Sequence, residues 1–197
     1  MMRWYAGIGS RRTPPEVAER MTRAAMRLEA LGFGLRSGAA QGADAAFEAG
    51  VSNPLAKQIF LPWRGFNGHE TGRCTLSQDA MDMAKRFHPG FEHLSIPAKK
   101  LMARNSYQIL GPDLSDPVLF VLCWTPDGCE SAQERQRGTG GTGQAIAMAS
   151  ACSIPVFNMQ RPKALDRLRE FLDQQGLLHL PNEPEVERLS VEFTQSK

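Results

Sequence analysis

The sequence has no long hydrophobic run and no apolar leader. None of the 197 residues lies in an unbroken apolar stretch of about 18, and the first twenty residues carry four arginines, at positions 3, 11, 12 and 20. A membrane-spanning helix needs about 20 apolar residues, and an export signal needs an apolar core. We therefore expect no membrane partner and a cytoplasmic location.

Cysteine and histidine are too few and too scattered for a metal centre or a disulfide framework. The four cysteines contain no C-x-x-C pair, and the segment around the one close histidine pair, His88 and His93, lacks the set of acidic and cysteine partners that would complete a site. Zinc sites usually combine such ligands at short, regular spacing. We expect free thiols, no bound metal and no resident cofactor.

Strong charge and the standard nucleotide fingerprints are also lacking. With 23 Lys and Arg against 21 Asp and Glu, the net charge is only +2, so the chain has no basic excess typical of a protein that binds duplex DNA. The sequence contains no G-x-x-x-x-G-K-[ST] motif, and residues 7–12 lack the third glycine of G-x-G-x-x-G. These absences disfavour a kinase, an ATPase or an ordinary NAD enzyme.

What the chain does contain is a regular alternation of β-type and helical segments. The β-type runs are residues 3–8, 33–36, 57–61, 118–122 and 154–158. Helical spacing covers residues 15–31, 45–49, 76–87, 97–110, 145–151 and 163–174. This order predicts an α/β fold, a Rossmann-like parallel sheet with helices on both faces. We expect a single domain over residues 1–176, a long loop at 62–74, and a loosely attached C-terminal tail at 177–197.

Three turns rich in small residues, at 7–11, 37–42 and 138–143, each follow a predicted strand and precede a predicted helix. The carboxyl ends of parallel strands meet at one edge of the sheet, so these turns should converge on one site. Glycine lets backbone amides approach an anion, and the following helix adds its positive end, which favours phosphate. The alternative is that these glycines only make tight turns. Ordering six flexible residues in a row, as at 138–143, costs considerable conformational entropy. Packing alone is a poor explanation for such a run, so we expect phosphate contact there.

Several of these segments resemble a known family. Gly9-Ser10-Arg11, the string RSGAAQGADAA at 36–46, Arg104-Asn105, the strand after Asp116 and the glycine turn before Ala145-Ile146-Ala147 are similar to the Rossmann-like core of the DNA-processing protein A (Smf) family. That core is related to the lonely-guy cytokinin-activating enzymes and to YspA-type proteins. The resemblance covers about residues 3–158. It implies that the three turns line a ligand pocket beside Asp44 and Arg104, and that the chain forms a homo-oligomer, a dimer in many relatives.

Two departures from the family bear on function. DNA-processing proteins usually carry further domains around this core, whereas here the sequence begins at the first predicted strand, so we expect the nucleic-acid machinery to be reduced to the core. In the lonely-guy enzymes the glycine turn reads G-G-x-G-T-x-x-E, and the glutamate catalyses N-glycosidic cleavage. Aligned through residues 140–143, that position is Ala147. Hydrolysis by that mechanism would lack its carboxylate.

These observations define a set of candidate site residues. Arg11 is placed for a phosphate or is a solvated charge, and Asp44 either accepts a ribose hydroxyl or a cation, or stabilises the start of a helix. The aromatic rings in the long loop either stack on a base or close the loop as an aromatic plug. The ring at the end of the central strand either stacks on a base or lies in the core. The ligand-binding candidates are Gly9, Ser10, Arg11, Ser37, Gly38, Gly42, Asp44, Arg104, Asn105, Gly140, Gly141, Thr142 and Gly143, and the stacking candidates are Trp63, Phe66 and Trp124.

The leading functional expectation is a protein that binds a nucleotide or a nucleotide-derived ligand, as a sensor, carrier or sequestering protein. No catalytic residue is assigned, because the only acids near the last glycine turn are Glu130 and Glu134, for which the sequence indicates no catalytic role. One alternative, implied by the resemblance, is a single-stranded DNA-binding recombination mediator. A further alternative is an N-glycosidase that acts on nucleoside monophosphates.

Overall fold

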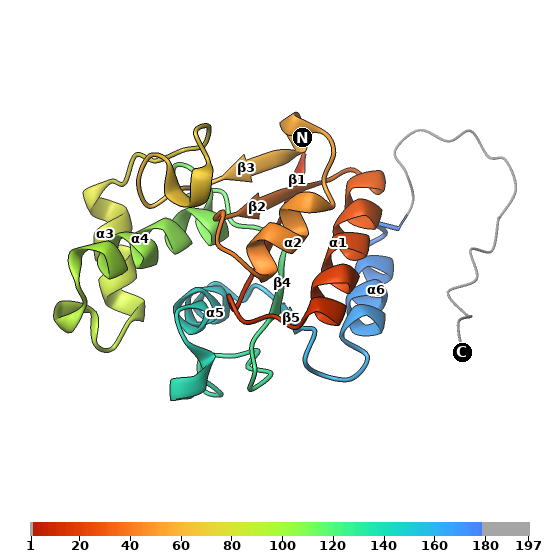
Figure 1. The fold of residues 1–197 in the computed structure, drawn as a ribbon. Helices are drawn as coiled ribbons and strands as arrows, with labels where there is room; N and C mark the ends of the chain where they lie inside the picture. The colour runs from red at the N-terminus through yellow and green to blue at the C-terminus, as the bar shows by residue number, and fades with distance from the viewer. Residues whose placement is uncertain (1, 179–197) are drawn as a thin grey trace, which may run out of the picture.

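A five-stranded parallel sheet, with strands in the order β3-β2-β1-β4-β5, forms the centre of the molecule (Figure 1). The computed structural model describes residues 2–178. The strands are β1 (Arg3–Gly9), β2 (Phe33–Ser37), β3 (Lys57–Ile59), β4 (Phe120–Trp124) and β5 (Val156–Asn158). This is the predicted Rossmann-like α/β architecture in a single domain. The order of strands reverses between β1 and β4, which is the switch point where such sheets bind ligands.

Helices cover both faces of the sheet. The helices are α1 (Pro15–Ala30), α2 (Ala43–Ala49), α3 (Gln78–Phe87), α4 (Ile96–Leu110), α5 (Thr142–Ala151) and α6 (Ala164–Gln174). One hydrophobic cluster joins α1, α2 and α6 to the first face, and a second joins α4 and α5 to the opposite face. Helix α3 lies outside these layers and packs on α4. The predicted arrangement of helices on both faces is confirmed.

The side chains of β4 alternate between the two clusters. Phe120 and Leu122 belong to the cluster under α1, α2 and α6, whereas Val121 and Cys123 belong to the cluster under α4 and α5. A strand buried on both faces is apolar throughout, as residues 120–124 are. Strand β4 begins two residues later than predicted, and the Val118 amide donates to the Ile109 carbonyl near the end of α4.

Three helices begin at a proline or a serine. A proline occupies the first turn of α1, and the side chains of Ser77 and Ser95 accept hydrogen bonds at the starts of α3 and α4. The predicted long loop contains a short 3₁₀ helix, Phe66–Gly68. This loop is held against α2 by His69, whose Nε2 lies 3.0 Å from the Glu48 carboxylate.

Within residues 2–178, no helix combines the length and hydrophobicity needed to cross a membrane. The same residues contain no group of three or more His, Cys, Asp or Glu side chains that could hold a metal ion. All four cysteines are free thiols, as the sequence predicts. The predicted tail begins with Leu177, whose amide donates to Leu172, and both Leu177 and Leu178 pack against the core. The rest of the predicted tail, 179–197, lies outside the described residues.

Candidate functional site

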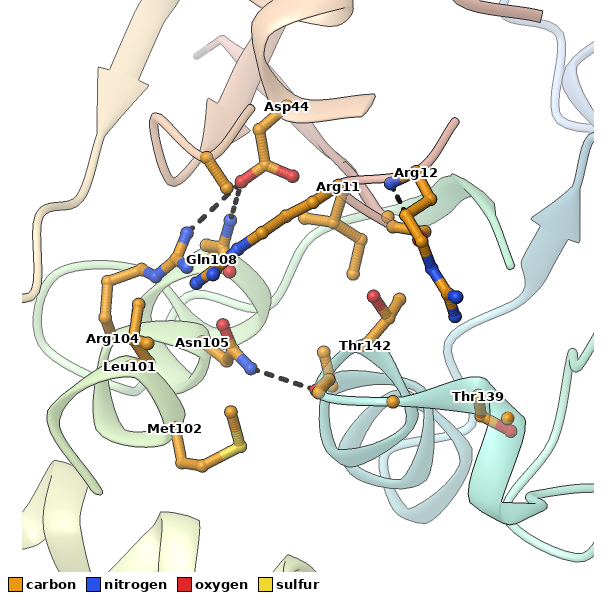
Figure 2. A pocket seen from close by; sticks show the side chains of 18 residues that line it. Arg11, Arg12, Asp44, Leu101, Met102, Arg104, Asn105, Gln108, Thr139 and Thr142 are labelled. Carbon is orange, nitrogen blue, oxygen red and sulfur yellow. Dashed lines mark hydrogen bonds and ion pairs between the residues drawn. The ribbon is translucent and has the colours of Figure 1, made fainter. Parts of the chain in front are cut away.

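A cavity of about 490 Å³ opens at the carboxyl ends of β1, β2 and β4, where the strand order reverses (Figure 2). Its wall combines the first turn, part of the second turn, one face of α4 and the third turn with the start of α5. Its size is typical of pockets for small ligands. The lining residues are Ile8, Gly9, Ser10, Arg11, Arg12, Ala40, Asp44, Leu101, Met102, Arg104, Asn105, Gln108, Gly138, Thr139, Gly140, Gly141, Thr142 and Ala145.

The structure brings most of the candidate residues together, but not all of them. Nine line the cavity, namely Gly9, Ser10, Arg11, Asp44, Arg104, Asn105, Gly140, Gly141 and Thr142. Seven are not among the lining residues, namely Ser37, Gly38, Gly42, Gly143, Trp63, Phe66 and Trp124. The other nine lining residues are not among the candidates, and the longest side chains of these nine include those of Arg12, Leu101, Met102 and Gln108.

The first turn is held by hydrogen bonds and carries two exposed cationic side chains. The Ser10 amide donates to the Trp124 carbonyl at 3.0 Å, and the Ser10 carbonyl accepts from the Thr13 hydroxyl at 2.7 Å. The side chains of Arg11 and Arg12 are exposed, and Figure 2 shows them spreading over the cavity in two directions, Arg11 toward α4 and Arg12 toward the third turn. The turn therefore places two positive charges above one cavity.

The third turn presents backbone donors that the protein itself does not use. No acceptor within residues 2–178 takes a hydrogen bond from the amides of Gly140, Gly141 or Thr142. These amides stand at the start of α5, a ten-residue helix whose positive end faces the cavity. The turn is anchored from behind, since the Thr139 hydroxyl donates to the Asp127 carboxylate. Unpaired amides on a fixed turn are a suitable site for an oxyanion.

The glycines of the second turn are explained by close packing, one of the two alternatives that the sequence left open. A Cβ atom on Gly38 would lie 1.1 Å from the Nη1 atom of Arg104, and one on Gly42, where φ is +78°, would lie 2.5 Å from the Ser10 carbonyl oxygen. The Ser37 hydroxyl donates to the Gly7 carbonyl at 2.7 Å. These three residues thus contact protein atoms.

Asp44 and Arg104 form a buried ion pair beside the second turn. Arg104 Nη1 donates to Asp44 Oδ2 at 3.2 Å, and the Gly38 amide donates to the same oxygen at 3.1 Å. The two side chains are 4% and 6% exposed. Burial raises the pKa of the Asp44 carboxyl, and Arg104 together with the Ala40 and Gly38 amides opposes that rise. Burial lowers the pKa of Arg104, which the carboxylate opposes.

Gln108 joins this pair to the middle of α4. When its Oε1 atom faces the second turn, it accepts from the Gly38 amide at 2.9 Å and from Arg104 Nη1 at 3.2 Å, while its Nε2 atom donates to Asn105 Oδ1 at 3.0 Å. We assign this orientation because the opposite one would point an amide nitrogen at two other donors.

Asn105 continues the polar network to the third turn. Its Nδ2 atom donates to Gln144 Oε1 at 3.0 Å and to the Gly141 carbonyl at 3.3 Å. Four of the five lining residues of α4, at positions 101, 104, 105 and 108, follow the spacing of one helical face. Had that spacing been extended from Arg104 and Asn105, it would have identified Leu101 and Gln108 from the sequence.

The predicted stacking rings lie away from the cavity wall. Trp63 and Phe66 pack edge to face with their centroids 5.1 Å apart, and Phe66 is buried against Leu61 and Ala39. Trp124 is buried in the core, and its Nε1 atom donates to Gln160 Oε1 at 2.9 Å. The plug and core roles account for these contacts.

The acids of the loop before the third turn are engaged elsewhere. Glu130 accepts from Arg167 at 2.9 Å, and Glu134 lies 2.7 Å from Arg161. Neither lines the cavity, and Ala147 is buried outside its wall. Of the lining residues, only Asp44 carries a carboxylate, against three arginines. The cavity is therefore electropositive.

The five-stranded parallel sheet of order 3-2-1-4-5 agrees with the Rossmann-like fold that the sequence resemblance implies, and it does not distinguish one family of that fold from another. The site described above rests on its own geometry. No family model, no curated protein and no solved structure matches the chain.

Proposed function

We propose that the chain binds a small phosphate-bearing ligand, a nucleotide or a nucleotide derivative, in the cavity at the switch point of the sheet. The observation that carries this proposal is the set of unpaired amides of Gly140, Gly141 and Thr142 at the start of α5, opposite the side chains of Arg11 and Arg12. A helix start combined with arginine side chains is a strong arrangement for phosphate. The cavity volume of about 490 Å³ suits a ligand of nucleotide size.

Binding without turnover fits the side chains of the cavity best. The one lining carboxylate, Asp44, already accepts hydrogen bonds from Arg104 and Gly38, so no free carboxylate of the wall is placed to act as a general base. The sequence resemblance to the core of DNA-processing protein A supports a ligand of the nucleotide class. In this proposal the protein acts as a sensor, carrier or sequestering protein.

Calorimetric titration of the purified chain tests the proposal. The panel contains mononucleotides, cyclic nucleotides, ADP-ribose-type nucleotides and a short single-stranded oligonucleotide, and each mixture is then analysed for breakdown products. We expect one class of small nucleotide to bind and to be recovered intact. Binding of the oligonucleotide alone, with steep salt dependence, would replace the proposal with single-stranded DNA binding. Release of a free base would replace it with N-glycosidase activity.

Substitution of the two exposed arginines connects binding to this cavity. Arg12→Ala should weaken affinity for the nucleotide identified above by about 10-fold to 100-fold, because it removes a charge-assisted hydrogen bond to a phosphate at the third turn, and Arg11→Ala should weaken it less, because that side chain reaches toward the α4 end of the cavity. Arg20→Ala, at an exposed position on α1, is the matched control and should leave affinity unchanged. Equal affinities of all three variants would place the ligand elsewhere.

A further inference from the structure

The donors around the Asp44 carboxylate are of the kind that hold an oxyanion. The Gly38 amide and Arg104 Nη1 lie 3.1 Å and 3.2 Å from Asp44 Oδ2, and the Ala40 amide donates to the same carboxylate. Two loop amides and a guanidinium that converge on one point resemble a phosphate site. Here the anion is supplied by the chain itself. We call these donors, the amides of Gly38 and Ala40 with the Arg104 guanidinium, the second-turn cradle.

The residues of the cradle are tightly packed. Gly38 leaves no space for a Cβ atom, which would lie 1.1 Å from Arg104 Nη1, so the guanidinium rests directly against the backbone of the turn. Gln108 supports it from α4. Asp44 and Arg104 are both more than nine-tenths buried. The donors are thus held in place by packing, as a selective binding site requires.

The cradle has more positive charge and more donors than one carboxylate uses. The Nε atom of Arg104 is buried and has no hydrogen-bond partner within the described part of the chain. The side chain of Arg11 reaches toward the same end of the cavity, as Figure 2 shows, and its charge contributes to lowering the pKa of Arg104. A buried donor without a partner is uncommon, and it means that the cradle could hold an anion with more oxygen atoms than a carboxylate, such as phosphate, once Asp44 is removed.

We propose that Asp44 determines the ligand specificity of the cavity by filling the second-turn cradle with a fixed negative charge. This inference rests on the proposed function. A ligand whose single anionic end lies at the third turn presents neutral groups to Asp44 and is accepted. A ligand with a second phosphate at the α4 end meets the carboxylate and is rejected. The cavity therefore selects nucleotides with phosphate at one end over nucleoside bisphosphates that carry phosphate at both ends.

Asp44→Ala tests the inference, because it empties the cradle while the amides and Arg104 stay. Inorganic phosphate is the probe, and the readout is the rise in melting temperature when phosphate replaces chloride at equal ionic strength. The unsubstituted protein should show a modest rise from the site at the third turn. Asp44→Ala should be less stable in chloride and should show a larger rise. Asp44→Ala combined with Arg104→Ala lacks the cradle and should lose the excess.

The outcomes separate the inference from the proposed function. Equal rises for the unsubstituted protein and Asp44→Ala overturn the inference alone. No rise for the unsubstituted protein, together with a rise for Asp44→Ala, overturns phosphate binding at the third turn and leaves the cradle standing.

Two further measurements keep the inference testable. If Asp44→Ala does not fold in either buffer, Asp44→Ser, which keeps a hydroxyl acceptor but leaves most of the cradle empty, replaces it, and a rise no larger than that of the unsubstituted protein overturns the inference. In calorimetry, the substituted protein should also gain at least about tenfold in affinity for a nucleoside 3′,5′-bisphosphate relative to the 5′-monophosphate. An unchanged ratio contradicts the assignment of specificity to Asp44.

Discussion

Gly38 illustrates, at the scale of one residue, how a glycine that looks like a phosphate contact can have a packing role. Alanine at this position would place its Cβ atom 1.1 Å from Arg104 Nη1 and push the guanidinium away from Asp44. We expect Gly38→Ala to lower the free energy of unfolding by about 3 kcal/mol, through overpacking and an unpaired buried charge. Urea denaturation measures this. The control is Gly138→Ala, which has open space around its Cβ; a loss as large as that of Gly38→Ala would refute the packing argument.

Asp127 predicts a pH dependence of stability. Burial raises the pKa of this carboxyl, but hydrogen bonds from Thr139 and Thr125 lower it, and the net pKa lies below its ordinary value. A carboxyl with a depressed pKa in the folded state contributes stability above its unfolded pKa, and this contribution is lost as the pH falls through the folded pKa. The stability difference between the unsubstituted protein and Asp127→Asn should be constant above about pH 5 and shrink below about pH 4.

Denaturant unfolding at several pH values measures this difference. Thr139→Val removes the main donor to Asp127. In a protein that carries Thr139→Val, the stability difference caused by Asp127→Asn should therefore depend much less on pH. A difference that stays constant down to about pH 3 would show that the carboxylate of Asp127 does not stabilise the turn.

At the scale of elements, the loop between β4 and α5 is held by ion pairs to α6 and its preceding loop. Glu130 accepts from Arg167 and lies 3.6 Å from Arg161, and its carboxylate also accepts from the Asn158 amide at 2.7 Å. These contacts assign Glu130 to structure. We expect Glu130→Gln to cost about 1–3 kcal/mol in unfolding free energy and to leave nucleotide affinity unchanged.

The control for Glu130 is Glu19→Gln on α1. Glu19 forms an exposed pair with Arg23 at 3.8 Å, and such pairs contribute less than about 1 kcal/mol. Thermal unfolding and calorimetry on the same samples give both quantities. If Glu130→Gln had normal stability but bound the nucleotide more weakly, Glu130 would be a residue of the binding site and not a structural one.

The elements themselves were accessible from the sequence because their signals are local. Apolar runs buried on both faces mark β1 and β4, and proline or serine marks the starts of α1, α3 and α4. The partners of side chains were not accessible. Asp44 and Arg104 are 60 residues apart, and neither residue type reveals that they pair. The sequence of the second turn therefore indicates a phosphate site, although the Asp44 carboxylate occupies the donors of that turn.

At the scale of the whole molecule, the position of the site follows from topology. An all-parallel sheet brings the turns after β1, β2 and β4 to one edge, and the reversal of order between β1 and β4 opens a space there. The alternation of segments was enough to predict this edge. Topology alone did not predict the contribution of α4, because the placement of this helix depends on the tertiary packing of the long segment between β3 and β4. Arg104 and Asn105 were identified through the family resemblance instead.

The three tryptophans make the whole molecule a useful optical system. Trp4 lies beside the Arg36 guanidinium at 5.2 Å, Trp63 packs on Phe66 and Trp124 bonds to Gln160, and none of them lines the cavity. Saturation with the nucleotide should therefore leave the native tryptophan emission almost unchanged, while unfolding should change it strongly. Strong quenching on binding would instead mean that an indole ring contacts the ligand.

Because the fluorophores are separate from the cavity, emission can report unfolding without interference from the bound molecule. The shift of the unfolding midpoint with added ligand then measures occupancy directly, and unlabelled compounds can be screened against the unmodified chain in a plate reader. The placement of the indole rings in the plug and the core, away from the wall, thus gives the protein an intrinsic fluorescent readout of what it binds.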